Sequence, residues 1–155
     1  MVARVSVNEV DALRSKARML QRAKQDLVGA RALALQADEL LDHMDGPLDR
    51  RADVYAGMAV IWRDLGEADR CEAMIVTAIA LEAEVEPARP IWLGTHKLFY
   101  ADFLHRQRRF AEAVQHGTEG VAIYARGIEP DHPELAALRA IVAGFVRDAR
   151  ANPPS

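Results

Sequence analysis

The stretch FAEAVQHGTEGVAIYARGIEPDHPELA, from Phe110 to Ala136, contains one helical pattern, a turn and the start of another helix. Apolar residues recur at helical spacing in its first part, and Pro130 and Pro133 bracket the turn. The same design occurs 42 residues earlier, where Cys71 corresponds to Ala113. A two-helix repeat of this length predicts a stacked array of helical hairpins, because a single hairpin cannot bury its apolar face alone.

Small and large residues keep this register along the chain. Ala59, Ala101 and Ala143 are each 42 residues apart, and we interpret them as places where one helix presses closely on its neighbour. Large residues recur beside them, as in the pair Met58 and Tyr100. We therefore expect an all-α fold, a right-handed stack of antiparallel hairpins with about seven helices and no strand.

Length and composition favour one soluble domain over residues 1–155. Half of the 155 residues are hydrophobic and the formal charge is −3, which disfavours a disordered chain and a dedicated nucleic-acid binder. No run of 18 apolar residues and no secretion signal is present, so we expect no membrane span and a cytoplasmic location. The preference for Arg over Lys and the abundance of Ala suggest a bacterial source.

Residues 7–44 leave two interpretations open. Apolar residues repeat at helical spacing in two series, separated by a polar tract from Gln21 to Asp26. The tract is either a turn, with Asp26 as the N-cap of a second helix, or part of one helix longer than thirty residues. We favour the hairpin. Residues 1–32 carry an excess of basic over acidic residues, which we interpret as a solvated helix face, with an anionic partner as the alternative.

The rest of the chain divides at its Gly and Pro residues. Gly46 and Pro47 precede a first repeat at 48–86, in which Gly66 separates helices at about 48–65 and 67–85. A second repeat at 91–128 has helices at about 91–106 and 110–127, with Arg108 and Arg109 in its turn. His132 is expected to cap a last helix at 133–150, which we interpret as a capping helix of the array.

At this point the chain resembles tetratricopeptide repeats of the kinesin-light-chain type, whose period is also 42. The resemblance covers residues 52–150 well and 7–44 weakly. The loop Pro130-Asp131-His132-Pro133 is its most specific match. The other matching residues are Tyr55, Met58, Ala59, Trp62, Gly66, Cys71, Ile75 and Ala78 in the first repeat, and Tyr100, Ala101, Phe110 and Ala113 in the second.

Four residues depart from the pattern: Arg108 at the turn glycine, Lys97 at the first aromatic position, and Gly117 and Gly120 inside a helix. Each helical glycine costs about 1 kcal/mol relative to Ala. Either the two glycines let a bulky neighbour such as Phe99 or Tyr100 come close, or they open a groove for a ligand or partner helix. Any special docking place would be sought first against them.

No catalytic pattern stands out in the sequence. The five histidines form no HxxxH or HExxH pair, and phosphate-binding and nucleophile motifs are missing. Cys71 lies between apolar helix positions and is interpreted as a small core residue. We therefore predict that the protein is not an enzyme, and we expect no cofactor and no metal site.

A binding surface is the better prospect. In tetratricopeptide arrays the first helices of the hairpins line a concave groove, so the resemblance implies partner-binding residues there: Arg63, Asp64, Asp102, His105, Arg106 and Arg147, with Asp148 beside them. The clamp that grips chaperone tails would need Asn and Lys where this chain has Asp53, Val60, Leu98 and Asp102, so that partner is disfavoured.

The predicted function is thus a non-enzymatic protein–protein interaction module, an adaptor or regulatory subunit that binds a peptide or partner helix in the groove. Two alternatives remain: a domain that senses a small molecule or signal peptide, and a scaffold that self-associates as a homodimer.

Overall fold

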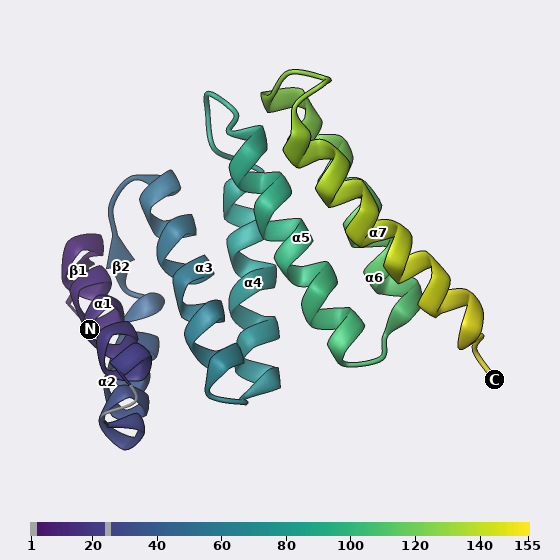
Figure 1. The fold of residues 1–155 in the computed structure, drawn as a ribbon. Coiled ribbons are helices and arrows are strands. Elements are labelled where there is room, and N and C mark those ends of the chain that lie inside the picture. Colours follow the sequence, from purple (N-terminus) through teal and green to yellow (C-terminus); the bar gives the residue numbers. More distant parts are fainter. Residues whose placement is uncertain (1–2, 24–25) are drawn as a thin grey trace. The chain divides into compact units, whose positions relative to one another are not determined.

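The computed structural model describes residues 3–23 and 26–155, and the chain divides into two compact units, 1–84 and 85–155. The first unit contains β1 (Val5–Ser6), α1 (Val7–Ala23), α2 (Leu27–Leu41), β2 (Met44–Asp45), α3 (Leu48–Asp64) and α4 (Ala68–Glu82). The second contains α5 (Pro90–Arg106), α6 (Phe110–Tyr124), a short 3₁₀ turn (Ala125–Gly127) and α7 (Pro133–Ala151). Figure 1 labels these helices and strands.

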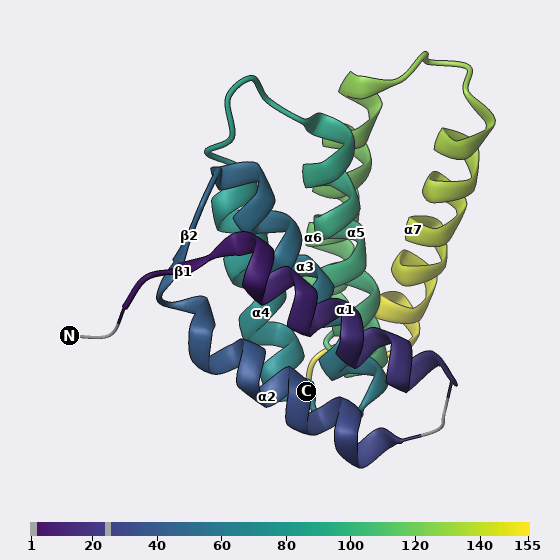
Figure 2. The ribbon, with the colours of Figure 1, turned by 90° about the vertical axis from the view of Figure 1, so that its left-hand side faces the viewer.

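The first unit consists of two antiparallel hairpins, α1–α2 and α3–α4, with α1 also packed on α3 (Figure 2). Residues 7–44 therefore form a hairpin of two helices, which is the interpretation that we favoured from the sequence. α1 continues through Gln21 to Ala23, so the predicted turn is shorter than the polar tract, and Lys24 and Gln25 lie outside the described residues. Asp26 caps α2 as expected, since its carboxylate accepts a hydrogen bond from the Gly29 amide at 2.7 Å.

Two short strands correct the expectation of no strand. Val5 pairs with Met44 and Ser6 with Asp45 in a parallel two-residue ladder that closes the first hairpin. Gly46 follows with φ of +151°, and the Val7 side chain occupies the space where a Cβ of residue 46 would lie. Such a short ladder has no period-two pattern, so no signal in the sequence predicts it.

α3 and α4 meet at Gly66, whose φ of +78° lets the chain reverse between them. Their contact buries small and large residues together, and Ala59, Trp62 and Cys71 are fully buried. Trp62 is held from α2, because its indole Nε1 donates a hydrogen bond to Asp38 at 3.1 Å. α4 ends at Glu82, about three residues before its predicted end. Its buried residues include Cys71, Ile75 and Ala78, as the repeat predicts.

The second unit is a hairpin, α5–α6, with α7 packed on α6. Val121, Tyr124 and Leu135 form its α6–α7 core. α6 ends at Tyr124 and tightens into the 3₁₀ turn, so its α-helical part is shorter than predicted. His132 caps α7 as expected, since its ring Nδ1 accepts a hydrogen bond from the Glu134 amide at 3.2 Å.

The expected fold class, an all-α stack of antiparallel helical hairpins, is confirmed, with seven α-helices in the described parts of the chain. Over those same ranges, no helix is both long enough and apolar enough to cross a membrane.

Candidate protein-interaction surface

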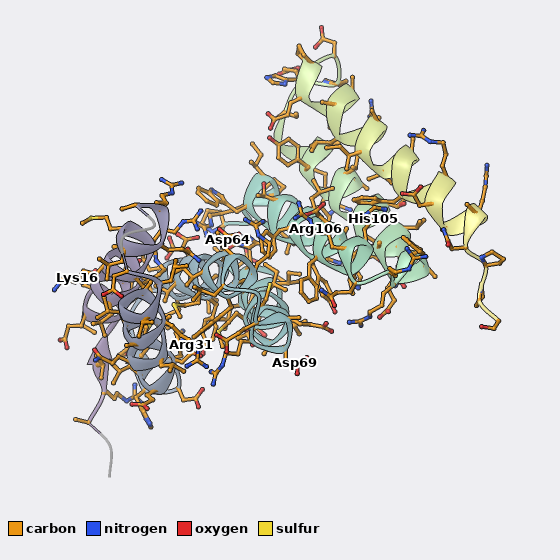
Figure 3. All side chains as sticks on the ribbon, turned by 60° about the horizontal axis from the view of Figure 1, so that its bottom comes forward. Lys16, Arg31, Asp64, Asp69, His105 and Arg106 are labelled. Atoms are coloured by element: carbon orange, nitrogen blue, oxygen red, sulfur yellow. The ribbon has the colours of Figure 1, made fainter. Side chains whose placement is uncertain are left out.

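Three of the predicted partner-binding residues lie at the C-terminal end of α5, where Figure 3 labels His105 and Arg106. Arg106 pairs with Asp102 one turn earlier, at 2.9 Å from Nε to carboxylate. The ring Nε2 of His105 lies 2.6 Å from the Asp148 carboxylate, and this contact joins α5 to α7. His105 also contacts two aromatic rings. The Phe145 ring stacks on it with ring centroids 4.7 Å apart, and the Phe110 ring lies in an edge arrangement with centroids 5.4 Å apart.

Arg147 lies on another face of α7. Successive helical residues are about 100° apart, so Arg147 and Asp148 point in different directions. One Arg147 amino group lies 3.5 Å from where a Cβ of residue 144 would be, over the outer side of α7. The structure therefore brings Asp102, His105 and Arg106 together, and it places Arg147 on a separate surface.

That separate surface is an exposed stripe along α7. Its members follow helical spacing and are all exposed: Ala136, Arg139, Ala140, Ala143, Arg147 and Arg150. We call it the α7 stripe. It combines small side chains, which allow a helix to approach closely, with three arginines. In the sequence, Ala143 is a predicted close-packing position and Arg147 a predicted binding residue, and no pattern connects the two.

The residues of α5 that correspond to the small residues of the α7 stripe are covered by a neighbouring helix. Ala101 of α5, 42 residues before Ala143, is fully buried, and a Cβ added at Gly117 of α6 would lie 3.5 Å from its methyl group. Gly94, 42 residues before Ala136, is in backbone contact with Gly120 of α6. In α7 the equivalent residues Ala136 and Ala143 are exposed. α7 thus carries the small-residue face of a first helix, and no helix of the second unit covers it.

In the first unit the candidates Arg63 and Asp64 belong to a network of bonds within the chain. Arg18 of α1 donates to Asp64 at 2.6 Å and to Gln21 at 2.7 Å. Buried Gln21 in turn donates to the Ile61 carbonyl of α3 at 3.0 Å. Burial opposes ionisation of Asp64, but hydrogen bonds from Arg18 and Arg63 outweigh it and lower the pKa of this carboxyl. These contacts tie α1 to the end of α3.

The basic N-terminal residues pair inside the first unit in the same way. Arg31 binds Glu67 with two hydrogen bonds of 2.8 and 2.9 Å, and Arg4 lies 3.6 Å from Asp45. Figure 3 labels Arg31 on α2. Glu67 and Asp45 lie outside residues 1–32, so part of the basic excess of this segment is balanced by acidic residues from later in the first unit. The solvated basic face expected there is partly an intramolecular ion-pair surface.

An apolar pocket of about 630 Å³ lies beside this ion pair in the first unit. Leu27, Val28 and Leu35 of α2 line it together with Leu65 from the end of α3. Val28 is 83% exposed. The sequence did not single out this pocket, because its walls come from two helices whose packing had to be known first.

The two helical glycines of α6 correct the idea that a docking place lies against them. Both are buried, and this chain fills the space around each: Val142, Phe145 and Ala101 at Gly117, and Leu98 with the Gly94 backbone at Gly120. The nearest atoms at both glycines thus belong to residues other than the expected Phe99 and Tyr100. The glycines allow α5, α6 and α7 to come close to one another.

Cys71 is fully buried, as predicted, and burial raises the pKa of its thiol to about 11. A thiol with so high a pKa is a poor nucleophile at neutral pH. His116 packs on the Tyr100 ring at 4.7 Å, and its buried Nδ1 has no hydrogen-bond partner within the described ranges. Burial lowers the pKa of His116, so the neutral ring is favoured. Both side chains serve packing.

The comparisons with known proteins agree with this architecture. No known protein-family description matches the sequence, and no curated protein matches it. Among solved structures, nearly identical TPR-like repeats of a kinesin light chain type from Podosopora anserina match with 17% identity and a TM-score of 0.72. A second structure of those repeats, with a single residue substituted, matches with 17% identity and a TM-score of 0.73. Each match covers 92% of this chain and 67% of the other. The chain thus has a TPR-like repeat fold.

Proposed function

We propose that this protein is a protein–protein interaction module, an adaptor or regulatory subunit, and that it binds a helix of its partner along the α7 stripe. One observation carries the proposal: Ala101 is fully buried under α6, whereas its counterpart Ala143 is exposed. Helical-repeat proteins bury such faces by stacking, and a capping helix is expected to have a polar outer face. The small residues of the α7 stripe depart from that expectation.

Helix capture of this kind rests on apolar contact with a few charged contacts around it. The α7 stripe has the small residues for close approach, and it includes Arg147, one of the residues singled out in the sequence. The surface at Asp102, His105 and Arg106 is the competing location, since it lies on a first helix and would belong to the concave groove. Its side chains already have partners within the chain: Arg106 pairs with Asp102, and His105 contacts Asp148.

The test is affinity capture by the full chain, followed by variants of each surface. Ala143→Trp should reduce capture of the partner by about tenfold or more, because the indole prevents close helix approach. Arg106→Glu should leave capture intact, and Arg22→Glu on exposed α1 serves as the control for a charge reversal. Helicity should be equal in all variants, since the three positions are exposed.

Capture lost with Arg106→Glu and retained with Ala143→Trp would move the binding surface to the groove and contradict the α7 proposal. Light scattering over a range of concentrations tests self-association, because a dimer that Ala143→Trp dissociates would mean a homodimeric scaffold. A metabolite that raises the melting temperature, with no protein captured, would favour the sensor alternative.

A further inference from the structure

The contact between α5 and α6 contains an ion pair that specifies more about the helix that the α7 stripe would bind. Lys97 Nζ of α5 lies 2.6 Å from the Glu119 carboxylate of α6, and only 19% of the Lys97 side chain is exposed. The hydrogen bond from Lys97 lowers the pKa of Glu119, so this carboxylate stays ionised. The small-residue contact between the two helices is therefore accompanied by one cation–carboxylate pair across it.

Arg139 is the residue of α7 that corresponds to Lys97, 42 positions later. It lies on the α7 stripe next to Ala140 and is exposed. Arg147 and Arg150 lie on the same stripe, and all of its charged members are cations. The two carboxylates of α7 lie elsewhere, since Glu134 is in the first turn and Asp148 contacts His105. This face repels a basic helix and attracts an acidic one.

We infer that the partner helix is acidic and amphipathic, that it runs antiparallel to α7 as α6 does to α5, and that it places a carboxylate opposite Arg139 in the register of Glu119. Small residues of this helix would face Ala136 and Ala143, as Gly120 and Gly117 face Gly94 and Ala101. The inference rests on the proposed function, because it describes the helix that the α7 stripe would bind.

A pocket of about 320 Å³ between α6 and α7 supports this register. Val121, Ala122, Ala125 and Val142 give it apolar walls, and Arg139 stands at its edge. A helix whose carboxylate reaches Arg139 would have an apolar side chain within reach of this pocket. Charge and apolar contact would thus be satisfied on the same side of the partner.

A second copy of this chain is a poor source of such a helix. The helices of this chain that pack on equivalent first-helix faces are α4 on α3 and α6 on α5, and both are already held in their hairpins. Ala78 and Cys71 of α4 and Ala113 of α6 are fully buried. To offer either helix, a second copy would have to open a hairpin and expose its core. A second copy therefore does not supply the helix that the α7 stripe would bind.

The experiment uses a labelled peptide of residues 67–85, which contain α4, with Cys71→Ala to prevent oxidation and Ile75→Ala to place a small residue opposite Ala143. Thr77 is the counterpart of Glu119, so one peptide carries Thr77→Glu and its matched control Thr77→Lys. Fluorescence anisotropy with the full chain should show the Glu peptide binding about fivefold more tightly than the Lys peptide at low salt. Arg139→Glu should reverse the preference, Arg22→Glu should not, and Ala143→Trp should abolish binding of both peptides.

Equal binding of the two peptides, still blocked by Ala143→Trp, would overturn the acidic partner and leave the proposed function standing. No peptide binding, while capture of the cellular partner remains sensitive to Ala143→Trp, would have the same meaning. A dimer that Arg139→Glu dissociates would show that the occupant is a second copy, against the inference. Peptide binding that Ala143→Trp leaves unchanged would overturn both the site and the inference.

Discussion

Gly66 and Arg108 hold the same position in the two repeats and adopt the same left-handed backbone conformation, with φ of +78° and +60°. Each lies in the turn between the two helices of its hairpin. A glycine reaches this region at no steric cost, whereas a side chain with a Cβ is strained there. Arg108 thus departs from the repeat pattern in residue type, whereas the backbone conformation of the turn is the same.

Arg108→Gly should stabilise the second unit. Relief of the backbone strain is worth about 1 kcal/mol. Part of that gain is offset, because the Arg108 guanidinium donates to Asn152 at 3.0 Å and lies 5.2 Å from the centre of the Phe110 ring. The free energy of unfolding from urea denaturation measures the change.

The reverse substitution, Gly66→Ala, isolates the backbone effect, since no atom lies within 4 Å of the added Cβ. It should destabilise by about 1 kcal/mol. An unchanged Gly66→Ala protein would show that this turn tolerates a Cβ without strain.

Asp38 is expected to be the most sensitive polar residue of the first unit. Its carboxylate accepts from Trp62 at 3.1 Å and from Arg70 at 2.8 Å, so it joins α2 to both α3 and α4. Burial raises the pKa of Asp38 even though both partners oppose the shift. Asp38→Ala should cost about 2 kcal/mol because the buried indole N–H loses its acceptor.

Asp38→Asn is the matched control, because its amide oxygen still accepts from Trp62. It should cost about half as much, on the order of 1 kcal/mol. If both variants unfold at the same urea concentration, the pair with Arg70 and not the indole bond determines the stability of this contact.

The glycines of the second unit should differ sharply in their tolerance of Ala. A Cβ at Gly94 would lie 2.8 Å from the Gly120 carbonyl oxygen and from the Tyr124 amide nitrogen, and backbone atoms cannot move aside. Gly94→Ala should therefore destabilise by about 1–3 kcal/mol.

At Gly117 the nearest atom is Val142 Cγ2 at 3.1 Å, which belongs to a side chain. A small shift of Val142 is offset by the better helix propensity of Ala, so Gly117→Ala should be within about 1 kcal/mol of neutral. Thermal unfolding followed by circular dichroism compares the two variants, and an equal loss in both would contradict the distinction between backbone and side-chain neighbours.

His116 should make stability depend on pH below neutrality. Its ordinary pKa is 6.5, and burial lowers this pKa in the folded chain. Below pH 6.5 the unfolded chain therefore binds a proton that the folded chain excludes, so the free energy of unfolding falls as the pH drops through this range. At higher pH the group has no effect.

His116→Phe keeps the ring contact with Tyr100 and removes the titration, so its stability should fall less than that of the wild type between about pH 7 and about pH 5. Glu112 and Glu119 do not interfere with this comparison between about pH 7 and about pH 5. Hydrogen bonds from Arg109 and Lys97 lower the pKa of each carboxyl below its ordinary value of 4.5. Parallel curves for the two proteins would show that the pKa of His116 is the same in the folded and the unfolded chain.

Local sequence signals predicted the helices well. Asp26 and His132 cap helices as their residue types indicate, and Gly66 reverses the chain where the repeat requires it. The ladder of β1 and β2 had no such signal. The sequence also did not predict the contacts of Arg18 with Asp64 and of His105 with Asp148, since 46 and 43 residues separate the partners.

Local sequence signals specify the period of 42, the helical hairpins and the positions where helices touch, because caps, turns and apolar spacing act within one or two turns of chain. Which of those positions another helix covers depends on the tertiary packing. Ala101 and Ala143 are identical in the sequence pattern, yet one is buried and the other exposed. The reason is physical: burial depends on whether a second helix packs against the face, and this cannot be predicted from the residue or from its neighbours along the chain.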